Sequence, residues 1–94
     1  MARLITLGRG GALDADRILL IASARSAPIK RLLAMLDTNQ IINLTYGYPR
    51  ETVILLEGGI FVIVSQTIED ITQLLGSLRI DHHEKTFKQR PSRS

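Results

Sequence analysis

A glycine pair between two apolar runs is the feature that most constrains how this 94-residue chain can fold. Glu57-Gly58-Gly59 separates Thr52–Leu56 from Ile60–Val64, and both runs are rich in β-branched residues. Consecutive glycines allow the positive φ angles that tight hairpin turns require, and β-branched residues favour strands. The sequence therefore predicts a β-hairpin over residues 52–64.

The apolar runs are continuous, which indicates strands that are buried on both faces. Ile18–Ala22 shares this property with the two strands of the hairpin. A strand with one solvated face would instead alternate between apolar and polar residues. Two further strands are predicted over Arg3–Leu7 and Ile41–Thr45, and Gly8-Arg9-Gly10-Gly11 is predicted to be a turn.

Two amphipathic helices are predicted beside the strands. The first has Ser26 as its N-cap and Pro28 in its first turn, and its apolar face runs to Leu36. The second begins at Thr67 and is expected to end near Gly76. The fold class is therefore α+β, a single small domain over residues 1–78 with about five mostly antiparallel strands, a C-terminal hairpin and two helices. Residues 79–94 are basic and polar, and we expect them to form a disordered tail.

The number of predicted helices indicates that the domain does not act as a monomer. Two helices of about three turns each cannot cover both faces of a five-stranded sheet. A second copy of the chain is the simplest source of the missing layer, so we predict a homo-oligomer.

Charge is segregated along the chain. Residues 1–50 carry seven Lys and Arg against three acids, residues 51–78 carry four acids and no base, and residues 79–94 carry five bases against two acids. Such segregation favours an anionic partner such as nucleic acid or an acidic membrane surface. No apolar run approaches the length of a membrane span, and we expect a cytoplasmic protein without membrane contact.

Most basic residues of the first half stand at predicted turns, strand ends or a helix start, where side chains can reach a flat anionic surface. Arginine, lysine and helix N-termini commonly bind phosphates, and tyrosines beside them supply stacking or hydroxyl donors. We predict double-stranded DNA as the partner. The candidate DNA-binding residues are Arg9, Arg17, Lys30, Arg31, Tyr48 and Arg50, with Arg25 and Tyr46 beside them.

Nothing in the sequence favours an enzyme. The chain has no cysteine, its Gly8–Gly11 segment lacks the spacing of a phosphate-binding loop, and its histidines, His82 and His83, are adjacent rather than four residues apart. We therefore expect no catalytic residues, no metal, no cofactor and no small-molecule substrate. Two other readings remain open: an interaction ring that binds acidic protein partners, and a module that binds small anions or nucleotides at the start of the Ser26 helix.

Three segments together resemble the RemA family of small bacterial regulators. They are Ser26-Ala27-Pro28-Ile29-Lys30-Arg31, then Thr45-Tyr46-Gly47, then the predicted hairpin. The likeness extends over about residues 3–76. It implies a DNA-binding transcriptional regulator that assembles into rings, contacts DNA through repeated arginines and activates biofilm-matrix genes.

The resemblance also implies roles for single residues. Arg17 matches a family arginine, important for DNA binding, that precedes the strand before the Ser-Ala-Pro helix. The family places paired arginines just after Tyr-Gly, whereas this sequence reads Tyr48-Pro49-Arg50, so Arg50 alone inherits that role. Lys30 and Arg31 have an alternative partner, because an acid of a neighbouring subunit such as Glu69 or Asp70 would satisfy the same charges.

Overall fold

The computed structural model describes residues 3–7 and 11–89, with side chains in these ranges as far as residue 78. Within them the chain forms six strands, two α-helices and two short 3-10 helices. The strands are β1 (Leu4–Thr6), β2 (Ala12–Asp14), β3 (Ile18–Ser23), β4 (Ile41–Leu44), β5 (Thr52–Leu56) and β6 (Ile60–Val64). The helices are α1 (Ala27–Met35), α2 (Ile68–Gln89) and the 3-10 turns η1 (Ala15–Arg17) and η2 (Thr38–Gln40). The predicted α+β class is confirmed.

The strands form two sheets. β1 and β2 make a two-stranded antiparallel sheet, and the other four strands are ordered β3-β5-β6-β4. All neighbours are antiparallel except β4 and β6, which run parallel. The predicted hairpin is confirmed, because Leu56 is opposite Ile60 and both Gly58 (φ 94°) and Gly59 (φ 83°) have positive φ.

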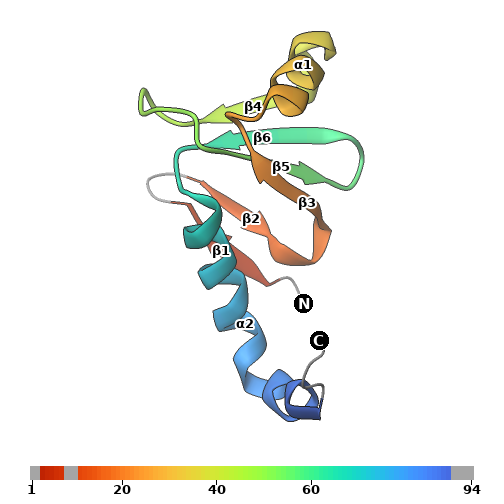
Figure 1. The fold of residues 1–94 in the computed structure, drawn as a ribbon, viewed down its shortest axis with the longest axis vertical. Coiled ribbons are helices and arrows are strands. Elements are labelled where there is room, and N and C mark those ends of the chain that lie inside the picture. The colour runs from red at the N-terminus through yellow and green to blue at the C-terminus, as the bar shows by residue number, and fades with distance from the viewer. Residues whose placement is uncertain (1–2, 8–10, 90–94) are drawn as a thin grey trace.

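The four-stranded sheet lies between two layers, with α1 on one face and both α2 and the β1–β2 hairpin on the other (Figure 1). Alternate residues of the central strands therefore pack in opposite directions. Ile54, Val62 and Val64 join a cluster with Ile5, Leu13 and Ile71. Val53, Phe61 and Ile63 join a second cluster with the apolar face of α1, which supplies Ile29, Leu32 and Leu33.

This arrangement corrects the argument that a second copy must cover the sheet. β5 and β6 are covered on both faces within one chain, because β2, which the sequence analysis missed, pairs with β1 and supplies the missing layer. β3 is different. A bulge falls between Ile18 and Leu20, and the side chains of Leu19 and Leu20 are 62% and 47% exposed. Within the four-stranded sheet, the exposed large apolar residues therefore lie on the two outer strands, with Leu19 and Leu20 on β3 and Ile42 on β4.

The predicted N-terminal cap forms its hydrogen bonds in α2 but not in α1. At α2, Thr67 Oγ1 accepts from the Asp70 N–H at 3.1 Å and Asp70 Oδ2 accepts from the Thr67 N–H at 3.3 Å, as the sequence predicts. At α1, Ser26 occupies the N-cap position, but its hydroxyl donates to the Ser23 carbonyl at 3.1 Å and makes no capping bond to the helix.

The predicted end of the second helix near Gly76 is wrong. α2 continues to Gln89, so residues 79–89 are helical where disorder was expected, and residues 90–94 lie outside the described residues. A glycine inside a helix costs only about 1 kcal/mol relative to alanine, and this one is flanked by good helix formers, namely Gln73, Leu74, Leu75, Leu78 and Arg79. None of the described helices is both long and apolar enough to cross a membrane.

Candidate anion-binding surface

The functional candidates lie at two opposite ends of the four-stranded sheet. The turn end holds the Gly58-Gly59 turn and the start of β3. The loop end holds the 45–51 loop between β4 and β5 together with the connection from β3 to α1. The six residues of β3 separate the ends, which corresponds to about 20 Å at the usual strand rise.

A tight turn begins the loop. The Tyr48 N–H donates to the Thr45 carbonyl at 2.9 Å, and the two residues between them, Tyr46 (φ 52°) and Gly47 (φ 89°), have positive φ. Asn43 fixes the turn from β4, because its Oδ1 accepts from Thr45 N at 3.0 Å and from Thr45 Oγ1 at 2.7 Å. Thr45 is consequently buried, whereas Tyr46 and Tyr48 are exposed.

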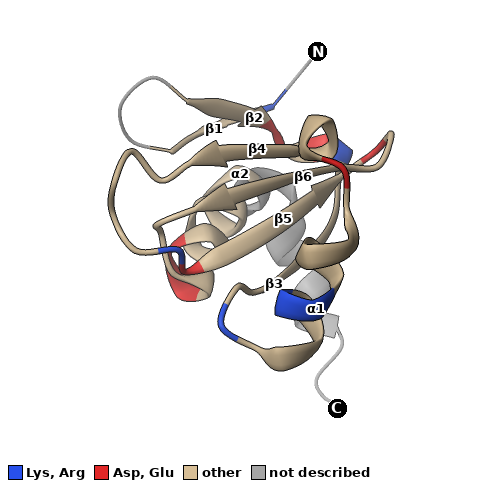
Figure 2. Ribbon diagram, turned by 90° about the horizontal axis from the view of Figure 1, so that it is seen from above, with Lys and Arg blue, Asp and Glu red and all other residues tan. Residues whose placement is uncertain are grey.

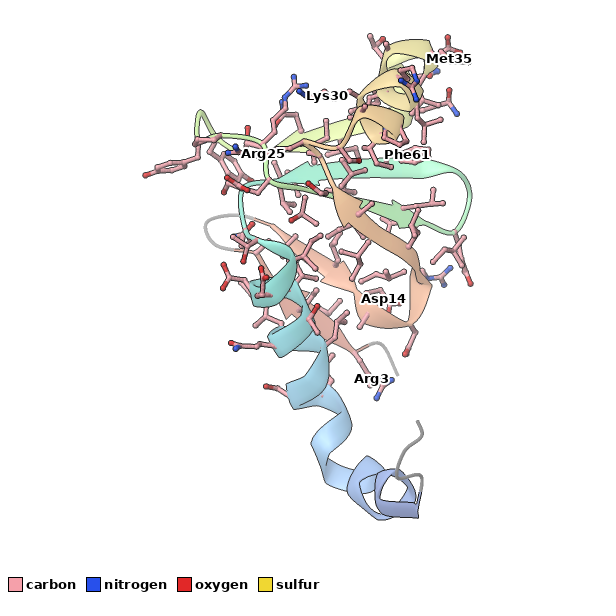
Figure 3. The ribbon with its side chains drawn as sticks, viewed as in Figure 1. Arg3, Asp14, Arg25, Lys30, Met35 and Phe61 are labelled. Atoms are coloured by element: carbon pink, nitrogen blue, oxygen red, sulfur yellow. The ribbon has the colours of Figure 1, made fainter. Side chains whose placement is uncertain are left out.

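An open pocket of about 600 Å³ lies at the loop end, on the face of the sheet that α1 covers. Three of its lining residues are basic and come from separate parts of the chain: Arg25 follows β3, Lys30 is in the first half of α1, and Arg50 precedes β5. Figure 3 shows Arg25 and Lys30 on the same side of the molecule. The other lining residues, none of them acidic, are Ala24, Leu33, Ala34, Ile41, Asn43, Pro49 and Ile63.

The pocket has more positive than negative charge around it. Arg25 Nη2 pairs with Glu51 Oε2 at 2.7 Å, but neither Lys30 nor Arg50 has an ion pair with any described residue. The first turn of α1 contains no acid, so the positive end of the helix dipole is not neutralised there. An anion bound here would be stabilised by the basic side chains that line the pocket.

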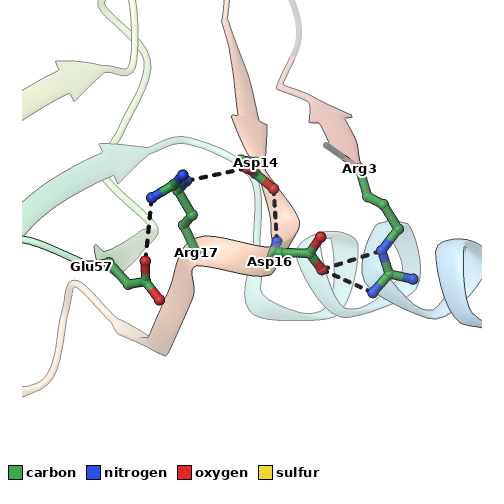
Figure 4. A network of polar contacts seen from close by, with 5 residues as sticks. All are labelled: Arg3, Asp14, Asp16, Arg17 and Glu57. Carbon is green, nitrogen blue, oxygen red and sulfur yellow. Dashed lines mark hydrogen bonds and ion pairs between the residues drawn. The ribbon is translucent and has the colours of Figure 1, made fainter. Parts of the chain in front are cut away.

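At the turn end, the basic residues already have acidic partners. Arg17 Nε lies 3.3 Å from Asp14 Oδ2 and its Nη1 lies 3.3 Å from Glu57 Oε1, while Arg3 pairs with Asp16 at 3.0 Å (Figure 4). Asp14 Oδ1 also accepts from the Asp16 N–H. The Arg17 side chain is nevertheless 64% exposed, so it remains accessible to a partner.

The structure thus brings together some of the predicted DNA-binding residues and separates others. Lys30 and Arg50 share the pocket, Arg31 follows Lys30 on α1, and Tyr48 is exposed beside Arg50. Arg17 stands at the opposite end of β3, and Arg9 lies outside the described residues, as do the side chains of His82 and His83. Figure 2 shows basic segments at several places around the sheet.

The sequence analysis missed the part that Asn43 plays. Asn43 lines the pocket and holds the 45–48 turn in place. An Asn two residues before a Thr is able to form such a side-chain turn, which was the available signal.

The fold and the site together define a small α+β domain with a basic, concave surface at one end of its four-stranded sheet. Comparison with known proteins gives the family. The model of the RemA-like family, described as extracellular matrix regulatory protein A-like, matches residues 4–75. The chain belongs to this family.

Curated relatives agree with the family assignment. The chain is 36% identical to a protein of Halalkalibacterium halodurans over 80% of this chain and 87% of the relative. It is 35% identical to a protein of Oceanobacillus iheyensis over 74% and 83%, and 34% identical to one of Brevibacillus brevis over 78% and 86%. All three carry the provisional designation of regulatory protein, so family and relatives together indicate a regulatory role.

Proposed function

We propose that this chain is a non-enzymatic, homo-oligomeric regulator of transcription that binds double-stranded DNA. The surplus of basic residues at the loop end carries the proposal, because Lys30 and Arg50 converge there without an acidic partner among the described residues. Lysine and arginine at such positions are suited to phosphate oxygens of the DNA backbone. The regulatory designation of the relatives is in keeping with this function.

The residues divide into two tiers. Arg50, Lys30 and Arg31 contact backbone phosphates, and Tyr48 supplies a hydroxyl donor or a stacking surface from the exposed part of the loop. Arg17 forms a second contact by exchanging its exposed carboxylate partners for phosphate. This exchange lowers its net contribution, because the ion pairs have to be broken before the new contact forms.

Assembly would multiply these contacts. In the described sheet, β3 pairs only with β5 and β4 only with β6, so each outer strand has a free edge. Apolar side chains are exposed on both outer strands, with Leu19 and Leu20 on β3 and Ile42 on β4. Pairing of one edge with the other edge of the next copy is a head-to-tail contact, which closes into a ring when the rotation permits. Each added copy then contributes another loop end to the same DNA.

The salt dependence of DNA binding tests the proposal. Fluorescence anisotropy with a labelled duplex, measured across a salt series, should give a steep linear fall of log affinity with log salt concentration. Arg50→Ala should reduce the slope by about one unit, since one phosphate contact is removed. Arg3→Ala is the matched control, because Arg3 is paired with Asp16 at the turn end and should leave the slope unchanged.

Mass photometry of the free protein completes the experiment. We expect a discrete species several times heavier than the 10.5 kDa chain. Failure to bind any duplex at low salt would contradict the DNA-binding role, and a monomer at micromolar concentration would contradict the assembly. The family description makes extracellular-matrix genes the first targets to test.

A ring that binds acidic protein partners is the second candidate. The observation that favours it is the 2.7 Å pair between Arg25 and Glu51, since this surface already holds a carboxylate. The two candidates differ in a pull-down with tagged protein. Partners that remain bound after nuclease treatment, together with salt-insensitive or absent DNA binding, would favour the protein-interaction ring.

A further inference from the structure

The loop-end pocket has features that contact with a DNA backbone does not require. A flat array of exposed cations is sufficient to bind phosphates along a duplex. Here the basic groups instead border an open, concave space of about 600 Å³, and six of its ten lining residues are aliphatic or proline. This volume falls within the usual range of pockets for small ligands.

The two kinds of lining residue are suited to two parts of one ligand. Lys30 and Arg50 suit a phosphate group. Leu33, Ala34 and Pro49 provide an apolar surface that suits a flat, weakly polar group. A free inorganic anion would use only the first part, whereas a nucleoside phosphate would use both.

We propose that this pocket binds a small phosphorylated ligand of the mononucleotide class. The phosphate lies between Lys30 and Arg50, and the base lies against Leu33, Ala34 and Pro49. A consequence rests on the proposed function: because Lys30 and Arg50 also contact DNA phosphates, the ligand competes with DNA and lowers its affinity. The pocket is then the place where a small molecule controls the regulator.

Calorimetry with four probes tests the ligand class: AMP, ribose 5-phosphate, adenosine and inorganic phosphate. AMP should bind at least about tenfold more tightly than each of the other three, because only AMP engages both the cations and the apolar wall. Equal affinity for AMP and inorganic phosphate would overturn the proposal and leave a simple anion site. Absence of heat from AMP at millimolar concentration would overturn it as well.

Two variants locate the site. Ala34→Trp fills the pocket from an exposed position of α1 without removing a charge, and it should weaken AMP binding about tenfold while changing DNA affinity less than about twofold. Lys30→Ala should weaken both ligands. Arg17→Ala, at the other end of the sheet, should leave AMP affinity unchanged. Unaltered AMP binding by Ala34→Trp would show that the pocket is not the site.

Competition separates this inference from the proposed function. Unlabelled AMP should displace the labelled duplex in anisotropy, and ribose 5-phosphate should do so only at about tenfold higher concentration. AMP binding without any DNA binding would remove the DNA-binding role and leave the pocket assignment standing. Normal DNA binding without an effect of AMP would overturn the inference alone.

Discussion

The two ends of the four-stranded sheet contain the same kind of backbone turn but build it from different residues. Each end contains a tight turn with two consecutive positive φ angles. The turn end uses Gly58 and Gly59, for which such angles are free of steric cost, whereas the loop end places a tyrosine, Tyr46, before Gly47. Tyrosine in this conformation costs on the order of 1 kcal/mol. The backbone is thus relaxed at one end and strained at the other.

The charges follow the same division. At the turn end, two arginines face three acids, and a hydrogen bond from the Asp16 N–H to Asp14 joins their ion pairs into one network (Figure 4). At the loop end, Arg25 is paired with Glu51, while Lys30, Arg31 and Arg50 have no ion pair within the described ranges. The acids of the α2 first turn, Glu69 and Asp70, follow β6 at this same end of the sheet, but α2 covers the face opposite α1 (Figure 1). Strain and unbalanced charge are tolerated where a partner compensates for them, which is in keeping with the DNA contact proposed for the loop end.

A matched pair of glycine substitutions tests the difference between the turn end and the loop end. Of the predictions made for the two ends, it should have the largest effect, on the free energy of unfolding. A Cβ at Gly47 or at Gly58 would meet no atom within 4 Å, so Gly47→Ala and Gly58→Ala differ from the native chain in backbone strain alone. Each should lower the free energy of unfolding by about 1–2 kcal/mol, measured by denaturant titration. Only Gly47→Ala should also weaken DNA binding, because it displaces the loop that holds Tyr48 and Arg50. Equal DNA affinities of the two variants would contradict the view that DNA binding depends on the loop end and not on the Gly58 turn.

An isosteric charge change tests the loop end more directly. Asn43→Asp keeps the oxygen that accepts from Thr45 N and Oγ1, so the turn is preserved, but it places a carboxylate in the basic pocket. DNA affinity should fall about fivefold, or ~1 kcal/mol, at low salt. Asn39→Asp makes the same chemical change in η2, outside the pocket, and is the control. If both variants bind DNA equally well, the pocket is not part of the DNA-binding surface.

The sequence predicts the turn end better than the loop end because its signals are local. Gly58 and Gly59 stand between two β-branched runs and define a hairpin within 13 residues. The pocket instead requires Arg25, Lys30 and Arg50 to converge from three elements. That convergence depends on the parallel pairing of β4 with β6, a long-range contact that no residue pattern encodes.

Short elements explain the remaining differences. β2 has three residues, too few for an alternation of apolar and polar residues to be recognised. Because β2 was not predicted, the β1–β2 hairpin was not expected to cover one face of the sheet, and one face of β5 and β6 appeared to need a second copy of the chain. The basic character of Arg17 was evident in the sequence, but its two ion pairs were not, since Glu57 is 40 residues away. The sequence therefore identified the basic residues, while the fold determines which of them remain free to bind.

The smallest expected effect concerns Arg17. It would make the contributions of the turn end and the loop end to DNA affinity more similar. Glu57→Gln removes one carboxylate partner of Arg17 at an exposed position, so DNA affinity should rise about twofold, or ~0.4 kcal/mol, in 50 mM salt. The rise should vanish above about 0.3 M salt, because exposed charges are screened there.

A double-mutant cycle tests whether Glu57 restrains Arg17. In the native background Arg17→Ala should weaken DNA binding less than Arg50→Ala does. In the Glu57→Gln background the effect of Arg17→Ala should grow, since phosphate no longer competes with Glu57 for the guanidinium. Additive effects in this double-mutant cycle would show that Glu57 does not restrain Arg17, and a loss from Arg17→Ala equal to that from Arg50→Ala would make both ends of the sheet equal DNA contacts.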